Sequence, residues 1–299
     1  MKNGGMSAIF RTRFAPSPTG YLHIGHAYAA MKAFQAAEKE DGTCLLRLED
    51  IDQTRCRPKF ETAIFEDLGW LGMHWPVPVR RQSDHFSDFE AVLSALQAKG
   101  VVYRSFLSRK EINTCLDRAG VEASPAGERP FSRHMTLLSG AEESERSEQG
   151  APFAWRLCLA ACREYLQDEW LTLGYVETGK GHGVETGWVK ARPEWLGDVI
   201  LARKDTPTSY HVAVCHDDML QGISHVVRGR DLMFATHVHV LIQKLMGWPT
   251  PVYAHHGLMT GADGRKFSKS DSSKTLRSLR KEGVKPEDVF NLVEELGVS

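Results

Sequence analysis

The fold is decided by residues 8–50, which read AIFRTRFAPSPTGYLHIGHAYAAMKAFQAAEKEDGTCLLRLED. Apolar and β-compatible residues over 8–15 lead into a proline-rich turn, a pattern that predicts a short buried strand. Apolar side chains then recur at helical spacing from residue 24 to residue 40, and residues 44–50 predict a second strand that ends in acidic residues. Strand, helix and strand in this order form a βαβ unit, which favours a parallel sheet of the Rossmann type in an α/β protein.

Two histidines, His23 and His26, stand at the predicted strand-to-helix turn with Gly25 between them. A helix N-terminus presents unpaired N–H groups and a partial positive charge. Two imidazoles beside it can stabilise negative charge that develops at a phosphorus atom. Gly25 leaves room for a flat ligand to approach the backbone. The alternative is that the two histidines only cap and pack the helix.

The rest of the chain predicts a second half of the same parallel sheet after an insertion. Alternating apolar residues predict strands at 198–204, 209–215 and 225–229, and a helix follows. Residues 117–150 are rich in Glu, Ser, Gly and Arg and predict surface structure without a continuous core face. We therefore expect a first half of the sheet domain at 1–106, a mixed α/β insertion at 107–190, a second half at 191–250 and a helical C-terminal segment at 251–299.

Composition places the chain among globular, cytoplasmic proteins. Its 299 residues, 42% hydrophobic and 25% charged, can bury a sizeable core, and the six scattered cysteines fit a reduced compartment. Neither an 18-residue apolar window nor a signal-peptide pattern occurs, so no membrane partner is expected. The formal net charge is −1, so a nucleic-acid partner would have to meet a local basic patch. Residues 265–285, with eight basic and two acidic side chains, are the candidate, and a solvated helix face is the alternative.

A lysine-rich stretch, GRKFSKSDSSK at 264–274, lies near the other end of the chain. Lys266 and Lys269 bracket Phe267 and Ser268, and two ammonium groups can bind a polyphosphate as point charges. Taken alone, the stretch slightly favours a solvated basic loop.

Together the two motifs resemble those of class I aminoacyl-tRNA synthetases, whose signatures are HIGH and KMSKS. HIGH is present literally at 23–26, and KMSKS appears at 266–270 with Phe for Met. The resemblance is closer still to the glutamyl branch, whose blocks occur in order: RFAPSPTGYLHIGHA (13–27), LLRLEDID (45–52), DTPTSYHVAV (205–214), HVVRGRDL (225–232) and DGRKFSKS (263–270).

The resemblance implies a glutamate site. Arg13 and Arg228 are expected to bind the carboxylates of glutamate, and Ser17 and Glu49 its amino-acid end. The site would comprise Arg13, Phe14, Ala15, Pro16, Ser17, Glu49, Tyr210 and Arg228. Guanidinium groups suit a dicarboxylate ligand, and an ammonium group needs an anion. The alternative is that the two arginines are structural and pair with Glu49, Asp50 or Asp231.

The resemblance also implies a two-step reaction. The α-carboxylate of glutamate would attack the α-phosphorus of ATP, and the glutamyl group of the adenylate would then pass to a hydroxyl on tRNA. His23, His26, Lys266 and Lys269 would be catalytic, and His23, Gly25, His26 and Lys269 would bind ATP, together with Mg²⁺.

The chain departs from the discriminating glutamyl enzymes in its length. Only 29 residues follow Ser270, whereas those enzymes carry a helical anticodon-binding region there, so none is expected here. This architecture resembles a truncated paralogue that activates glutamate without tRNA and attaches it to the queuosine base in the anticodon loop of tRNA(Asp). The alternatives are a minimal enzyme that charges tRNA(Glu), a catalytically silent binding protein and a small-molecule adenylyltransferase. A monomer is expected.

Zinc is not expected. Several relatives have a Y-x-C-x-C stretch after the third strand, but Ser105 and Leu107 stand at the cysteine positions here. Cys158 and Cys162 are interpreted as core residues, and the histidine pairs at 255–256 and 237/239 as packing or surface residues rather than ligands.

Overall fold

The computed structural model describes residues 9–181, 183–203, 205–259 and 274–295. Its N-terminal part is the predicted βαβ unit, formed by β1 (Arg11–Phe14), α1 (Ile24–Lys39) and β2 (Thr43–Leu48). β1 and β2 are parallel, with Arg13 opposite Leu45, and β3 (Arg80–Arg81) pairs parallel to β2 on the other side. The predicted parallel arrangement of the first two strands is thus confirmed.

A second sheet supplies the other half of the central layer. β9 (His225–Gly229) and β10 (Val252–His256) are parallel, and the hairpin of β6 (Gly174–Glu177) and β7 (Gly187–Lys190) extends the sheet beyond β10. The N–H of Ser224 donates to the carbonyl oxygen of Arg11 at 2.9 Å, so the two sheets meet along β1 and β9. This junction brings the two parts of the predicted parallel layer together.

A third, antiparallel sheet belongs to the other end of the molecule. It consists of β4 (Val102–Ser105), β5 (Ala154–Leu157) and β8 (Ile200–Arg203), in that order. The strand expected at 198–204 therefore exists, but it does not belong to the parallel sheet. Strand pairing does not respect the expected limit at residue 190. β6, which precedes it, pairs with β10, and β8, which follows it, pairs with β5. The domain limits stay a prediction.

The strand expected at 209–215 is wrong, because these residues open helix α7 (Tyr210–Leu220). Every residue from Val212 to Asp218 is buried, since α7 packs against α3 (Phe86–Ala98) and α8 (Ala235–Met246). The alternation of apolar residues at 209–215 is misleading here, because a helix segment that is buried on all sides shows no helical amphipathic period.

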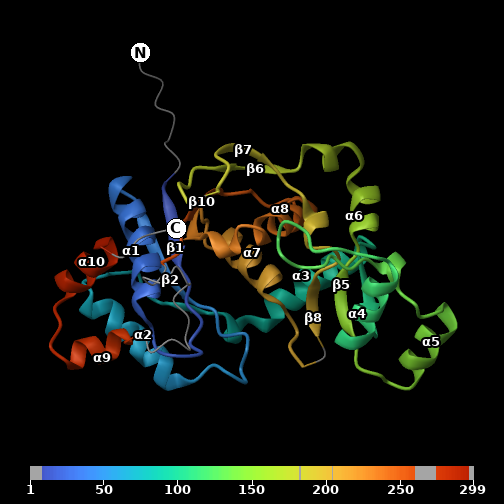
Figure 1. The fold of residues 1–299 in the computed structure, drawn as a ribbon, viewed down its shortest axis with the longest axis horizontal. Helices are drawn as coiled ribbons and strands as arrows, with labels where there is room; N and C mark the ends of the chain where they lie inside the picture. The colour runs from blue at the N-terminus through green and yellow to red at the C-terminus, as the bar shows by residue number, and fades with distance from the viewer. Residues whose placement is uncertain (1–8, 182, 204, 260–273, 296–299) are drawn as a thin grey trace, which may run out of the picture.

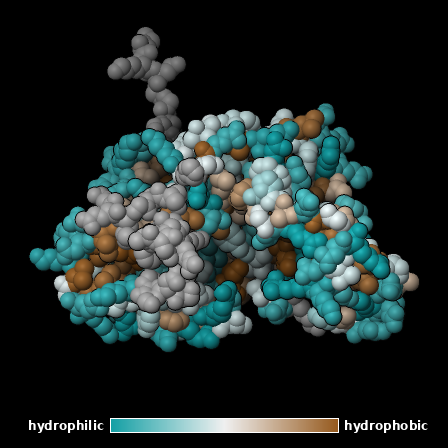
Figure 2. All heavy atoms as spheres, in the orientation of Figure 1, coloured by the Kyte–Doolittle hydropathy of each residue, from teal (hydrophilic) through white to brown (hydrophobic). Residues whose placement is uncertain are grey.

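The remaining helices lie toward the two ends of the molecule. They are α2 (Pro58–Trp70), α4 (Arg109–Arg118), α5 (Gly140–Glu148), α6 (Leu159–Leu166), α9 (Leu276–Lys281) and α10 (Pro286–Glu295). Figure 1 shows α9 and α10 beside α1 and α2 at one end, and α4, α5 and α6 at the other. The space-filling view in Figure 2 shows a notch between these two ends at the lower edge.

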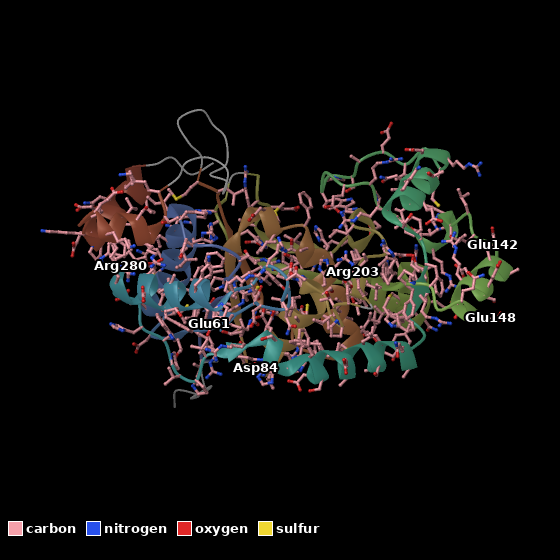
Figure 3. All side chains as sticks on the ribbon, turned by 90° about the horizontal axis from the view of Figure 1, so that it is seen from below. Glu61, Asp84, Glu142, Glu148, Arg203 and Arg280 are labelled. Carbon is pink, nitrogen blue, oxygen red and sulfur yellow. The ribbon has the colours of Figure 1, made fainter. Side chains whose placement is uncertain are left out.

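Segment 117–150 is mostly exposed, as expected, although Phe131 within it is buried in a small core with Cys115 and Leu116. α5 has no buried residue, and Glu142 and Glu148 on it lie at the far end of the molecule in Figure 3. Among the described residues, no helix is both long and apolar enough to cross a membrane.

Candidate active site

The N-terminus of α1 holds the two histidines in a reciprocal cap. The N–H of Gly25 donates to Nδ1 of His23 at 3.1 Å, and the N–H of His23 donates to Nδ1 of His26 at 3.2 Å. A Cβ atom at Gly25 would lie 3.0 Å from Cε1 of His23, so any larger residue there would make this ring shift by a few tenths of an ångström. The rings, 3.9 Å apart between centroids, also line a cavity. The capping interpretation is thus confirmed, and the catalytic role stays a prediction.

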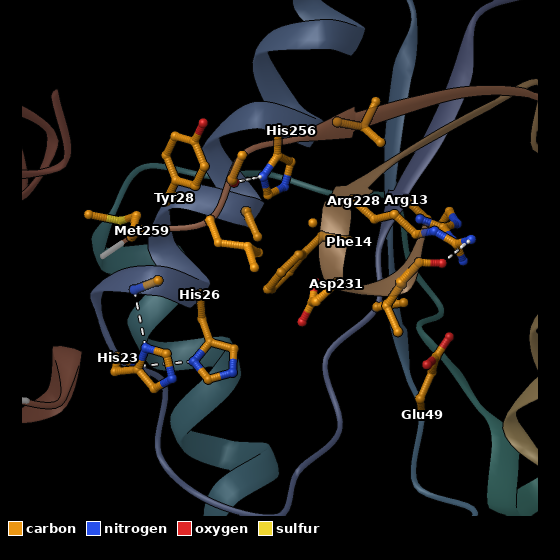
Figure 4. Close-up of a pocket in the computed structure, with 18 of the residues that line it drawn as sticks. Arg13, Phe14, His23, His26, Tyr28, Glu49, Arg228, Asp231, His256 and Met259 are labelled. Carbon is orange, nitrogen blue, oxygen red and sulfur yellow. Dashed lines mark hydrogen bonds between the residues drawn. The ribbon is translucent and has the colours of Figure 1, made fainter. Parts of the chain in front are cut away.

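This first cavity has a volume of about 540 Å³ and lies between α1, β9 and β10 (Figure 4). Nine of the predicted site residues line it: Arg13, Phe14, Ala15, His23, Gly25, His26, Glu49, Tyr210 and Arg228. Pro16 does not; its carbonyl oxygen instead accepts from the N–H of Glu49 at 3.1 Å. Sequence reasoning missed Tyr28 and His256 in the lining, whose rings meet edge to face at 4.9 Å.

Arg228 reaches the cavity from β9 and is buried. Its guanidinium group donates to the Tyr210 hydroxyl at 3.0 Å and to Thr236 Oγ1 at 2.7 Å. It also donates to the carbonyl oxygen of Leu232 at 3.1 Å and to Nε2 of His255 at 3.1 Å. Within the described part of the chain none of its hydrogen-bond acceptors is a carboxylate, so the structural ion pair considered for it is not formed with Glu49 or Asp50.

Arg13 differs, because it pairs with an acid that sequence reasoning did not consider. Its Nε lies 3.0 Å from Oδ1 of Asp218, which comes from α7. The same oxygen accepts from Nη1 of Arg47 at 2.8 Å, and Nη2 of Arg47 reaches Glu49 at 3.0 Å. Burial raises the pKa of Asp218, but Arg13 and Arg47 outweigh it and hold that pKa below its usual value.

With Asp231, Glu49 is one of two carboxylates that line the cavity. Burial raises its pKa above the usual value, although Arg47 and Arg13 act in the opposite direction. Its neighbour Asp50 points elsewhere and accepts from the N–H and hydroxyl of Ser83 at 2.8 and 2.6 Å. The cavity thus carries cationic groups together with two carboxylates, Glu49 and Asp231.

A second cavity of about 700 Å³ shares Glu49 and Tyr210 with the first. Ser17, predicted for the glutamate site, lines this cavity and not the first. Its wall includes four arginines, Arg55, Arg129, Arg156 and Arg203, and Figure 3 shows Arg203 near the middle of the molecule. The wall also includes the acids Asp52, Glu128 and Asp198. Glu49 and Tyr210 are therefore wall residues of two adjoining cavities.

Lys266 and Lys269 lie outside the described residues. The chain that follows them does return to the histidines, because Thr275 forms an isolated β-bridge with His23. The N–H of Leu276 also donates to the carbonyl oxygen of Leu22 at 2.8 Å. The residues next to the lysine-rich stretch are thus beside the start of α1.

Part of the basic run at 265–285 is engaged within the chain. Arg280 pairs with Glu66 at 2.6 Å, and Arg277 donates to the Tyr21 hydroxyl at 2.9 Å. These contacts favour the structural interpretation for those two side chains, so fewer charges of the run are available to a nucleic acid than its composition suggests.

The region considered for zinc contains other groups. Ser105 ends β4 and is buried, and Leu107 packs against the small core of α4. Cys162 is buried and its pKa is raised by that burial, as expected of a core thiol. Across the part of the chain that the structure describes, no group of three or more His, Cys, Asp or Glu side chains could hold a metal ion.

Comparison with known proteins gives consistent results. The family model of class I tRNA synthetases (E and Q), catalytic domain, matches residues 9–299. The chain is 40% identical over 289 residues to the glutamyl-Q tRNA(Asp) synthetase of Rhodobacter capsulatus, covering 94% of this chain and 99% of that protein. It is 34% identical to the glutamate–tRNA ligase of Aquifex aeolicus, covering 97% of this chain but 57% of that protein.

The solved structures agree on the fold. A glutamate tRNA ligase from Elizabethkingia meningosepticum, crystallised in complex with its amino acid, superimposes with a TM-score of 0.72 at 26% identity. The match covers 96% of this chain and 61% of that one. The chain thus spans about three-fifths of the length of the glutamate–tRNA ligases that it matches, and nearly the whole of the Rhodobacter protein.

Proposed function

The chain belongs to the class I tRNA synthetases of the E and Q branch and is an enzyme of the ligase type, and from this we propose a specific reaction for it. The chain would activate L-glutamate with ATP in the absence of tRNA and transfer the glutamyl group to the queuosine base in the anticodon loop of tRNA(Asp). The observation that supports activation most is one cavity with Arg228 at one side and the capped histidines at the other. The acceptor is supported by the end-to-end match to the Rhodobacter protein.

Glutamate would lie with its side-chain carboxylate at Arg228. The Tyr210 hydroxyl accepts from Arg228, so its own proton can be donated to the same carboxylate. Glu49 would bind the ammonium group, because its oxygens lie in the wall of the cavity away from the histidines (Figure 4). An amino acid with an uncharged side chain would leave a buried guanidinium without its anion, which disfavours it.

Activation would proceed at the α1 end of the cavity. An oxygen of the α-carboxylate attacks the α-phosphorus of ATP, and the bond to the pyrophosphate oxygen breaks. His23 and His26 would stabilise the negative charge at phosphorus, together with the helix N-terminus. We propose from the sequence that Lys266 and Lys269 hold the leaving pyrophosphate. Mg²⁺ neutralises phosphate charge when bound, and since the described residues offer no cluster of ligands it would be carried by the phosphates of ATP.

Transfer would use the second cavity. A hydroxyl of the modified base attacks the carbonyl carbon of the adenylate, and AMP leaves. Because Glu49 and Tyr210 line both spaces, a nucleoside in the second cavity could reach a glutamyl group in the first. The arginines of the second cavity suit the phosphates that flank such a nucleoside.

The test is transfer of labelled glutamate to three RNAs side by side: queuosine-containing tRNA(Asp), unmodified tRNA(Asp) and tRNA(Glu). We expect label only on the first, and glutamate-dependent pyrophosphate exchange without any tRNA. Label on tRNA(Glu) would instead identify a minimal charging enzyme. Absence of exchange in the presence of each tRNA would indicate a silent binding protein.

A further inference from the structure

Arg228 is a buried cation whose immediate acceptors are uncharged. It is 6% exposed, and its Nη atoms donate to Tyr210, Thr236 and Leu232. A buried charge without an opposite charge nearby is costly, and the cost falls only where negative potential reaches it. Asp218 supplies part of that potential. A second carboxylate, Glu177, lies behind His255, one residue further from the cavity.

His255 connects Arg228 to a carboxylate. The guanidinium Nε–H donates to Nε2 of His255 at 3.1 Å, and Nδ1 of the same ring lies 2.5 Å from Oε2 of Glu177. A guanidinium group is always protonated, so Nε2 has to be the unprotonated nitrogen of the ring. The hydrogen of the imidazole therefore lies on Nδ1 and is donated to Glu177. Burial lowers the pKa of His255 to about 4, in agreement with a neutral ring.

Glu177 is itself held rigidly at the end of β6. Its Oε1 accepts from the N–H of Gly179 at 2.7 Å and from the N–H of His255 at 2.9 Å, and the residue is 2% exposed. A Cβ atom at residue 179 would lie 2.2 Å from the carbonyl oxygen of His255, so only glycine permits this approach. The close contact and the two backbone donors fix where the carboxylate lies.

We propose that Glu177 and His255 are positioning residues for substrate binding by Arg228. The imidazole fixes the guanidinium through its Nε–H, and Glu177 fixes the tautomer that makes this possible. Keeping the carboxylate one ring away leaves the positive charge of Arg228 available to a substrate carboxylate, whereas a directly paired acid would compete for it. Arg13, which pairs directly with Asp218, illustrates that other arrangement. The inference rests on the proposed binding of glutamate at Arg228.

The test is Glu177→Gln in the full chain, assayed by pyrophosphate exchange at varied glutamate and at varied ATP. A glutamine amide can donate to Nδ1, which allows the other tautomer and turns an Nε2–H toward Arg228. We expect the KM for glutamate to rise about 10- to 100-fold and the KM for ATP to stay within about twofold. Glu177→Asp keeps the charge and should lie closer to the wild type.

The matched control is Glu185→Gln, which removes an exposed carboxylate just before β7, in the same connection, and should leave both constants unchanged. An unaltered KM for glutamate in folded Glu177→Gln overturns the proposal. Equal increases in both KM values also overturn it, because they indicate general damage.

A second measurement does not depend on turnover. ¹⁵N NMR of the His255 ring should show the Nδ1–H tautomer in the wild type, and the Nε2–H tautomer there would refute the positioning role. Wild-type protein without glutamate-dependent exchange would refute the proposed function and leave this tautomer result standing.

Discussion

Neutralising Asp218 by Asp218→Asn should destabilise the fold by about 3 kcal/mol. Oδ1 of Asp218 lies 3.0 Å from Nε of Arg13 and 2.8 Å from Nη1 of Arg47, and both arginines are buried. At an effective dielectric constant of about 20, each such pair attracts by roughly 5–6 kcal/mol before desolvation is counted. Removing one partner of a buried pair costs about 3–5 kcal/mol net. The lower value applies because Arg47 keeps Glu49 at 3.0 Å and Asp217 at 4.0 Å.

The assay is urea denaturation at pH 7, followed by tryptophan fluorescence, with Asp117→Asn as the control. Asp117 also accepts from an arginine, Arg129 at 2.8 Å, but its side chain is 70% exposed, so that variant should lose less than about 1 kcal/mol. If Asp218→Asn lost no more than the control, the buried network would not be held together by charge, and this account of it would fail.

The pH dependence gives an independent check. The folded-state pKa of Asp218 is lowered, so its contribution to stability is complete above the unfolded-state pKa of about 3.9. It is lost as the pH falls from there through the lower folded-state pKa. The difference in unfolding free energy between wild type and Asp218→Asn should therefore be constant from about pH 7 to pH 5 and shrink below pH 4.

The remaining predictions concern activation. His26→Ala and Lys269→Ala should each reduce glutamate-dependent pyrophosphate exchange by about 100-fold or more, and intact exchange in either would remove its catalytic role. Arg228→Lys should raise the KM for glutamate but not for ATP, because an ammonium group cannot replace the planar guanidinium. Equal changes in the two KM values would contradict this role of Arg228. Gly25→Ala should lower exchange about tenfold without loss of helix stability, since its Cβ would lie 3.0 Å from the His23 ring, and unchanged exchange would show that the ring position is not needed.

Local patterns in the sequence predicted the elements that have a hydrophobic period. The βαβ unit follows from a strand, a helix with one apolar stripe and a second strand, and the structure has all three. α7 could not be found this way, because residues 212–218 are buried on every side and their period carries no information. The pairing of β8 with β5 could not be predicted from local patterns either, because strand pairing depends on contacts between distant segments.

The site residues also fall into those that the sequence predicted and those that it did not. Signature residues such as His23, His26 and Arg228 were found through their motifs, and they do line one cavity. Asp218 and Glu177 were missed because their partners are 205 and 78 residues away in the chain. No local spacing could indicate such pairs.

The two arginines of the cavity have different electrostatic surroundings, and under the proposed function we expect this difference to set the direction of the bound amino acid. Arg13 is largely neutralised by direct contact with Asp218, whereas Arg228 has only uncharged acceptors in direct contact within the described residues. The positive potential should therefore be strongest at Arg228, and the negative potential at Glu49. Glutamate, with an acidic side chain and an ammonium group, matches both ends, but glutamine matches only one. We therefore expect the cavity to select glutamate over glutamine through Arg228 rather than through both arginines equally.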